Sequence, residues 1–110
     1  MYKFSLSGKT AIVTGGGSGI GRAIASCFAQ QDARVHILEK DEKSLSSTLH
    51  DIKCPGGSIS GDLCDVSDLG KVRESIDRCA DKFDAIDILV NNAGVASIGS
   101  LSQTSEDELD

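Results

Sequence analysis

The chain has 110 residues, 39% of them hydrophobic, and a formal net charge of −6, values that fit one globular domain. Its acidic residues are spread along the sequence without a basic patch, so we expect no nucleic-acid partner. No apolar run approaches the ~20 residues of a transmembrane helix, and residues 1–9 lack the features of a secretory signal. We therefore expect a soluble chain with no membrane partner and an intracellular location, first in the cytoplasm and second in an organelle.

The cysteines and histidines show no metal-binding pattern. None of the four cysteines forms a CxxC pair, and neither His36 nor His50 stands at zinc-like spacing. Without a secretory signal we interpret the cysteines as reduced thiols, with Cys27 and Cys79 on apolar faces of predicted helices. We expect no metal site, a strand-interior position for His36 and a surface position at a helix end for His50.

Residues 9–14 form a predicted buried strand, and the glycine-rich sequence TGGGSGIG of residues 14–21 follows it. Glycine at Gly15, Gly19 and Gly21 permits a tight turn and a close approach of the backbone to an anion. A helix that begins at Gly19 would direct its free N–H groups at bound phosphates. The loop is therefore a predicted phosphate site.

The residues around these glycines exclude two related loops. A P-loop would continue with Lys and Ser or Thr, whereas Arg22 and Ala23 follow here, and Ile20 stands where the pattern GxGxxG requires glycine. The pattern that fits is GxxxGxG. The helix after it is expected to end near Gln31, with one apolar stripe. The stripe comprises Ile20, Ala23, Ile24, Cys27 and Phe28.

Two further helices and three further strands are predicted. The segment 34–39 is apolar on both faces, as in a parallel strand covered by helices. Asp41 caps a short helix that the sequence 55–57 (PGG) terminates, and Ser67 begins a longer one. Residues 58–64 are interpreted as a strand only from their position between helices, and residues 86–90 as a fourth strand. The apolar faces are Leu45, Leu49 and Ile52 in one helix and Leu69, Val72, Ile76, Cys79, Ala80 and Phe83 in the other.

The alternation βαβαβαβ with right-handed crossovers predicts an α/β fold, a doubly wound parallel sheet with strand order 3-2-1-4. The first and fourth strands flank the topological switch point, where such sheets bind ligands. Both unusual loops, TGGGSGIG and the NNAG of residues 91–94, follow these two strands. The sequence thus predicts one ligand site between them.

Glu39 ends the second strand, 18 residues after Gly21, close to the position at which an acid accepts hydrogen bonds from the adenosine ribose of a dinucleotide. A carboxylate there would repel a 2′-phosphate. We therefore expect NAD rather than NADP, although Lys40 beside it leaves NADP as the alternative.

With these features in place, the chain resembles the short-chain dehydrogenase/reductase family, in its ordinary, non-extended branch. The resemblance rests on TGxxxGxG, on Glu39, on Cys64-Asp65-Val66 after the third strand and on Asn91-Asn92-Ala93-Gly94 after the fourth. It implies a Rossmann-like cofactor domain over residues 1–110, incomplete at its C-terminus. It further implies that Ser18 and Ile20 bind the pyrophosphate through backbone groups, that Asp65 and Val66 contact the adenine, and that Asn91, Ala93 and Gly94 run under the adenosine ribose towards the nicotinamide. For Asp65 a helix cap is the alternative, and Asn92 is expected to stabilise the sheet.

Members of the family interconvert alcohols and carbonyls by hydride transfer, using a Ser and a Tyr-x-x-x-Lys pair. The single tyrosine here is Tyr2, followed four residues later by Leu6, so we expect no catalytic residue in this chain. Ser105 and Glu108 form a capping box two residues before the last residue, Asp110, which suggests an interrupted helix.

The first hypothesis is accordingly the cofactor-binding part of an oxidoreductase that is inactive alone and acts on an alcohol or carbonyl, as a homo-oligomer, when complete. A non-catalytic dinucleotide-binding or interaction module is the second. An unrelated doubly wound flavin or nucleotide-sugar protein is the third.

Overall fold

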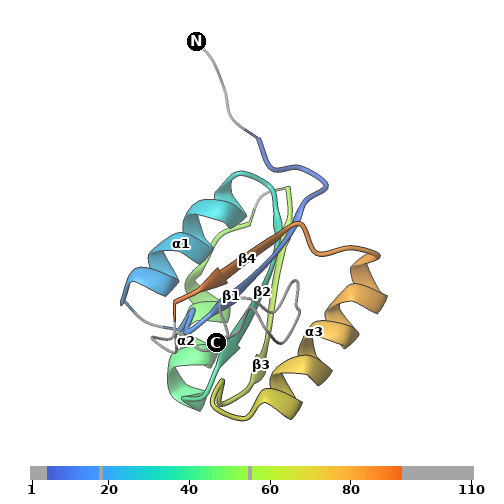
Figure 1. Ribbon diagram of the computed structural model, residues 1–110. Coiled ribbons are helices and arrows are strands. Elements are labelled where there is room, and N and C mark those ends of the chain that lie inside the picture. The colour runs from blue at the N-terminus through green and yellow to red at the C-terminus, as the bar shows by residue number, and fades with distance from the viewer. Residues whose placement is uncertain (1–4, 18, 55, 93–110) are drawn as a thin grey trace.

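The computed structural model describes residues 5–17, 19–54 and 56–92. In this part of the chain, four parallel strands form one sheet in the order β3-β2-β1-β4, against which three helices pack (Figure 1). The predicted doubly wound fold and its strand order are confirmed. The elements are β1 (Thr10–Thr14), α1 (Gly19–Gln30), β2 (Arg34–Glu39), α2 (Glu42–Asp51), β3 (Ser58–Leu63), α3 (Leu69–Phe83) and β4 (Ile88–Asn91).

The sheet is covered on both faces, with α1 and α2 on one side and α3 on the other (Figure 1). Because side chains alternate along a strand, neighbouring residues of β1 serve opposite layers. Val13 belongs to the core cluster under α1 and α2, and Ile12 to the cluster under α3. Both are completely buried, and burial of each such side chain contributes about 1.5–3 kcal/mol. This two-sided burial explains why the middle of β1, from Ala11 to Val13, is apolar.

The register brings the carboxyl ends of the strands to one edge of the sheet. Thr14, the last residue of β1, pairs with Leu38 of β2 on one side and with Asn91 of β4 on the other. Glu39 at the end of β2 pairs with Leu63 of β3. All the loops predicted to hold the ligand therefore leave the sheet at the same edge.

The predicted apolar stripe of α1 is partly wrong. The buried residues of this helix are Gly21, Ala25 and Ala29, whereas Ile20 is 72% exposed and Cys27 is also exposed. Small side chains at 21, 25 and 29 let the helix axis approach the sheet closely, so the larger Ile24 and Phe28 pack at the flank of this face. The helix is therefore rotated relative to the expected stripe.

Two element boundaries also differ from the prediction. The N-cap of α3 is Asp68, whose carboxylate accepts the N–H of Lys71 at 3.2 Å, rather than Ser67. β4 begins at Ile88 rather than at residue 86. At the residue before it, the side chain of Asp87 accepts the N–H of Thr10 at 2.9 Å, in place of a backbone carbonyl. The Asp41 cap of α2 is confirmed, since its carboxylate accepts the N–H of Ser44 at 2.9 Å.

Candidate functional site

The hydroxyl of Thr14 joins the ends of β1 and β4. Its Oγ1 lies 3.3 Å from the carbonyl oxygen of Val90 and 3.2 Å from Oδ1 of Asn91, and it accepts the N–H of Asn92 at 2.9 Å. Thr14 is only 1% exposed, so these bonds form away from bulk water, where leaving one unmade is costly. The start of the glycine loop and the start of the NNAG sequence are thus held together at the predicted switch point.

Gly21 lies where these two loops meet the first turn of α1. A Cβ at this position would lie 2.5 Å from Nδ2 of Asn92 and would also collide with the carbonyl of Gly15. That carbonyl is within reach of the Asn92 amide, with Nδ2 at 3.5 Å. Only glycine allows α1 to approach the loop this closely. The Asn92 side chain therefore lies between the glycine loop and the end of β4.

The first turn of α1 is open to a ligand. Gly19 has a positive φ of +56° and begins the helix, and both Gly19 and Ile20 are exposed. No acidic residue occupies this first turn. The helix dipole and its unpaired N–H groups therefore present a partial positive charge, which suits the phosphates of a bound anion.

Glu39 is buried, 8% exposed, and its carboxylate faces the glycine loop. Oε1 accepts the N–H of Gly17 at 3.0 Å, and Oε2 accepts the N–H of Asp41 at 3.0 Å. A carboxylate offers about four lone-pair sites, so two backbone bonds leave capacity for ribose hydroxyls. A Cβ on Gly17 would lie 2.8 Å from Cγ and from Oε1 of Glu39, so glycine at this position allows the contact.

Asp65 and Val66 follow β3 at the same edge, where Cys64 donates its N–H to the carbonyl of Glu39 at 2.9 Å. The exposed Asp65 carboxylate accepts both the N–H and the hydroxyl of Ser67, and these bonds lower the pKa of its carboxyl. It thus forms an Asx turn and does not cap α3. The Val66 side chain is buried in the cluster under α3, so a contact between Val66 and a ligand would use its backbone.

Other predicted site residues fall outside the part that the structure describes. These site residues are Ser18, Ala93 and Gly94. Tyr2 and the capping box that begins at Ser105, which are not site residues, also lie outside the described part. Within the described residues, the structure brings together the ends of β1, β2 and β4 and the start of α1. The predicted residues at that edge are Gly15, Gly19, Ile20, Gly21, Glu39 and Asn91, and Asp65 and Val66 follow the neighbouring end of β3.

Sequence reasoning missed the contacts of Gly17, at the centre of the loop, and of Thr48, which binds it. The N–H of Gly17 binds Glu39, and its carbonyl accepts the hydroxyl of Thr48 at 3.2 Å. Gly17 belongs to a run of three glycines, so its special packing is invisible in the pattern. Thr48 could have been suspected, because it shares the inward face of α2 with Leu45 and Ile52.

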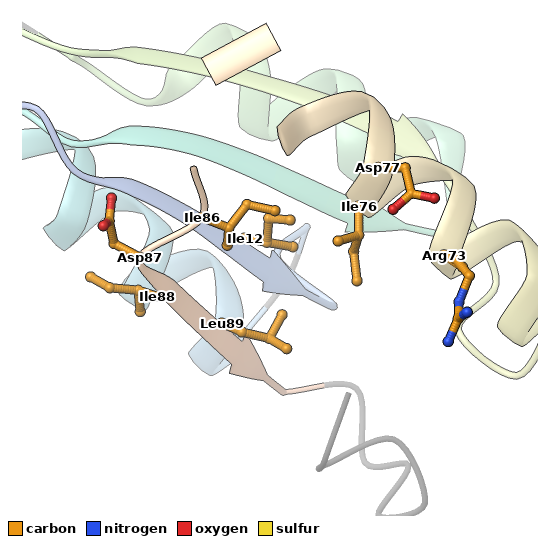
Figure 2. Close-up of a pocket in the computed structure, with 8 residues that line it drawn as sticks. All are labelled: Ile12, Arg73, Ile76, Asp77, Ile86, Asp87, Ile88 and Leu89. Atoms are coloured by element: carbon orange, nitrogen blue, oxygen red, sulfur yellow. The ribbon is translucent and has the colours of Figure 1, made fainter. Parts of the chain in front are cut away.

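A cavity of about 580 Å³ lies elsewhere, between α3 and β4. Figure 2 shows that its walls come from α3, from Ile12 of β1 and from residues 86–89, and none of the predicted ligand residues is among them. In the part of the sheet that the structure describes, β4 is an edge strand. The residues that line the cavity are Ile12, Arg73, Ile76, Asp77, Ile86, Asp87, Ile88 and Leu89.

Neither histidine lies at the edge of the sheet from which the glycine loop leaves. His36 lies inside β2 as expected, with Nδ1 2.8 Å from Oγ of Ser60 and Nε2 3.1 Å from Oδ2 of Asp62. His50 is at the end of α2 with 87% of its side chain exposed.

The described residues contain no group of three potential metal ligands. In the same residues, no helix has the length and apolar character that a membrane span requires.

Comparison with known proteins agrees with this architecture. Residues 9–110 match the family model for short chain dehydrogenase. The chain is 38% identical over 109 residues to a D-threitol dehydrogenase of Mycolicibacterium smegmatis, covering 99% of this chain and 42% of the relative.

Two solved structures are similar in both sequence and fold. One is a short chain dehydrogenase of Burkholderia cenocepacia in complex with NADP, with a TM-score of 0.74, 40% identity, and coverage of 94% of this chain and 42% of that one. The other is a metagenomic short-chain oxidoreductase in complex with NADP, with a TM-score of 0.75, 34% identity, and coverage of 94% and 47%. The chain thus spans less than half of the length of each of these proteins. It belongs to the short-chain dehydrogenase family.

Proposed function

We propose that this chain is the dinucleotide-binding part of an oxidoreductase that interconverts an alcohol and a carbonyl compound. The observation that carries this proposal is the packing of Gly21 against Asn92 and Gly15, which joins the phosphate loop to the end of β4 at the switch point. Glycine at Gly17 and Gly21 lets the loop pack directly on Glu39 and on Asn92, and the first turn of α1 supplies N–H donors without an acidic neighbour. These features fit a pyrophosphate.

The nicotinamide cofactor would supply the hydride, and the residues of this chain would bind and orient it. Backbone groups of Ser18 and Ile20 would hold the pyrophosphate, Glu39 the adenosine ribose, and Asp65 with Val66 the adenine. Asn91, Ala93 and Gly94 would continue towards the nicotinamide. These assignments come from the family resemblance, and the position of Glu39 beside Gly17 supports the ribose contact.

For the choice of dinucleotide, two observations point in opposite directions. The two solved structures described above are complexes with NADP, which favours NADP at the level of the family. Glu39 favours NAD, because its carboxylate is fixed by two backbone N–H groups and would repel a 2′-phosphate. We propose NAD, since Glu39 belongs to this chain whereas the bound NADP belongs to other proteins.

Calorimetric titration of the 110-residue chain with NAD and with NADP tests the proposal. We expect heat of binding with NAD, a higher melting temperature, as linkage requires for a ligand that prefers the folded state, and an affinity for NADP at least about tenfold weaker. Absence of both heat and a thermal shift with either dinucleotide would contradict dinucleotide binding. Tighter binding of NADP would contradict only the preference for NAD.

A second candidate is a dinucleotide-binding module without catalysis, which is favoured by the absence of a Tyr-x-x-x-Lys pair from the 110 residues. Both candidates predict that this chain alone does not oxidise the reduced cofactor with a carbonyl substrate. The two candidates predict different results for a longer form that carries a Ser and a Tyr-x-x-x-Lys sequence after Asp110. Turnover by such a form supports the oxidoreductase, and binding without turnover supports the module.

A further inference from the structure

Both peptide units that flank Gly17 are held by side chains from outside the glycine loop. Its N–H donates to Oε1 of Glu39 at 3.0 Å, and its carbonyl accepts the hydroxyl of Thr48 at 3.2 Å. Both bonds are buried, and Thr48 is completely inaccessible to solvent. The centre of the loop is therefore fixed from the end of β2 and from the middle of α2.

The environment of Thr48 makes this bond specific. The residue lies on the inward face of α2, which it shares with the buried Leu45 and Ile52. A hydroxyl buried among apolar side chains is costly unless it is hydrogen-bonded, and a threonine in a helix commonly bonds to the preceding turn of the same helix. Here the hydroxyl reaches a carbonyl 31 residues away in the sequence. The bond therefore ties α2 to the loop.

The direction of this carbonyl matters for a ligand. A peptide unit is planar and trans, so its C=O and N–H point in opposite directions. The carbonyl of Gly17 and the amide of Ser18 belong to one such unit, and that amide is one of the groups that the family resemblance assigns to the pyrophosphate. The bond to Thr48 thus fixes the Gly17 carbonyl, at the centre of the loop, before a ligand arrives.

A second contact ties α2 to the other end of the loop. Arg22, in the first turn of α1, donates to Asp51 at 2.8 Å and to Ser47 at 3.3 Å. Because this ion pair is solvent-exposed it is worth little by itself. Like the buried Thr48 bond, this contact involves α2, which therefore contacts the centre of the loop and the first turn of the helix that follows it.

We propose that Thr48 is a positioning residue for dinucleotide binding: its hydroxyl holds the glycine loop in the conformation that accepts the pyrophosphate. This inference rests on the proposed function. A loop that is already ordered does not lose conformational freedom on binding, so preorganisation increases affinity. The effect should be confined to ligands that carry the pyrophosphate.

The test compares Thr48→Val with Thr48→Ser and Thr10→Val. Valine removes the hydroxyl and retains the shape, whereas serine retains the hydroxyl. Thr10 is the matched control, because it is completely buried and its Oγ1 has no hydrogen-bond partner among the residues that the structure describes. Thermal unfolding first establishes that each variant is folded at the temperature of the titrations.

Dissociation constants are measured for ADP-ribose, which carries the pyrophosphate, and for adenosine, which lacks it. We expect Thr48→Val to weaken ADP-ribose binding about tenfold, ~1.4 kcal/mol, and adenosine binding less than about twofold, ~0.4 kcal/mol. Thr48→Ser should restore most of the affinity, and Thr10→Val should bind like the parent chain. Equal losses for both ligands, the same loss in Thr10→Val, or no loss in Thr48→Val would overturn the positioning role.

Amide hydrogen exchange separates failure of this inference from failure of the proposed function. If the parent chain binds neither ligand, the proposed function fails and the role of Thr48 in ligand binding fails with it. The effect of Thr48 on the loop is still measured in the ligand-free chain. There Thr48→Val should accelerate exchange of the Gly17 amide at least about tenfold, which corresponds to a decrease of ~1.4 kcal/mol in the free energy of local opening. Unchanged exchange at Gly17 would show that Thr48 does not hold the loop.

Discussion

The side-chain amide of Asn92 occupies the space beside Gly21, where an added Cβ would lie 2.5 Å from Nδ2. Gly21→Ala should therefore displace either the first turn of α1 or the NNAG sequence. We expect a loss of about 1–3 kcal/mol in the free energy of unfolding, the usual cost of overpacking, and at least a tenfold loss of affinity for NAD. Urea denaturation and calorimetric titration measure the two effects.

Gly70→Ala is the matched control for this substitution. Gly70 is an exposed residue of α3, and a Cβ there would meet only Oδ1 of Asp68, at the ordinary contact distance of 3.5 Å. Alanine in an exposed helix should stabilise the chain by about 0.4–1 kcal/mol and leave NAD binding unchanged. A Gly21→Ala variant as stable as Gly70→Ala would show that the loop is not packed as described.

Glu39→Gln tests the basis of cofactor preference. One end of the glutamine side chain is an NH₂ group, so it would face the N–H of Gly17 or of Asp41 donor to donor. We expect a loss of about 1–3 kcal/mol of stability and a shift of the NADP-to-NAD affinity ratio towards NADP by at least about tenfold, because the repelling charge is gone. Glu42→Gln, which removes an exposed carboxylate from the first turn of α2, is the control. An equal shift in both variants would attribute the effect to net charge alone.

The carboxylate of Asp62 predicts a pH dependence of stability. Burial raises the pKa of this carboxyl, but the bonds from Arg78 and His36 outweigh it, so the net pKa is lowered. Oδ2 of Asp62 lies 2.9 Å from the Arg78 guanidinium and 3.1 Å from Nε2 of His36. Since an unfolded Asp titrates near ~3.9, ionised Asp62 stabilises the fold above that pH and ceases to do so as the pH falls through its lower folded pKa.

Asp62→Asn should therefore be less stable than the parent chain at pH ~7. The difference between the two free energies of unfolding should become smaller as the pH falls below ~4. Urea denaturation across this range measures it. Glu74→Gln, which removes an exposed carboxylate from α3, serves as the control for net charge. A difference that stays constant down to the acid limit of the fold is inconsistent with the described ion pair.

Cys27, Cys64 and Cys79 should differ in the rate at which they react with a thiol reagent. Burial raises the pKa of Cys64 and of Cys79, with the charge of Asp62 adding to the effect, and the thiolate is the reacting form. Cys27 is exposed. At pH ~8 we expect Cys27 to react first and Cys64 and Cys79 to react only after denaturation. A Cys27→Ser variant that keeps a fast-reacting thiol at position 64 or 79 would contradict the packing of α3 on the sheet.

The sheet topology was readable from the sequence because its rules are local and repetitive. Apolar runs of strand length, the glycine loop and the acid at Glu39 fix which segments are strands and where they end, and right-handed crossovers then leave the order 3-2-1-4. The cap at Asp41 was readable for the same reason, since a capping carboxylate acts within three residues.

Two of the missed features depend on packing between segments far apart in the sequence. The buried face of α1 was placed wrongly because periodicity marks large apolar residues, whereas close packing on the sheet selects Gly21, Ala25 and Ala29. The third is local: Ser67 does not cap α3, because its N–H and hydroxyl donate to Asp65, and Asp68 is the cap instead. No pattern within one element could have paired Thr48 with Gly17.

The most direct test of the central claim is an NMR titration of the ¹⁵N-labelled 110-residue chain with NAD, in which every backbone amide reports its own position. We predict that the largest shift changes fall on residues 15–21, on Glu39 and on Asn91 and Asn92, the edge formed by the ends of β1, β2 and β4. Shift changes centred on Ile76 and Leu89, in the cavity between α3 and β4, or no changes at all, would contradict a dinucleotide site at the glycine loop.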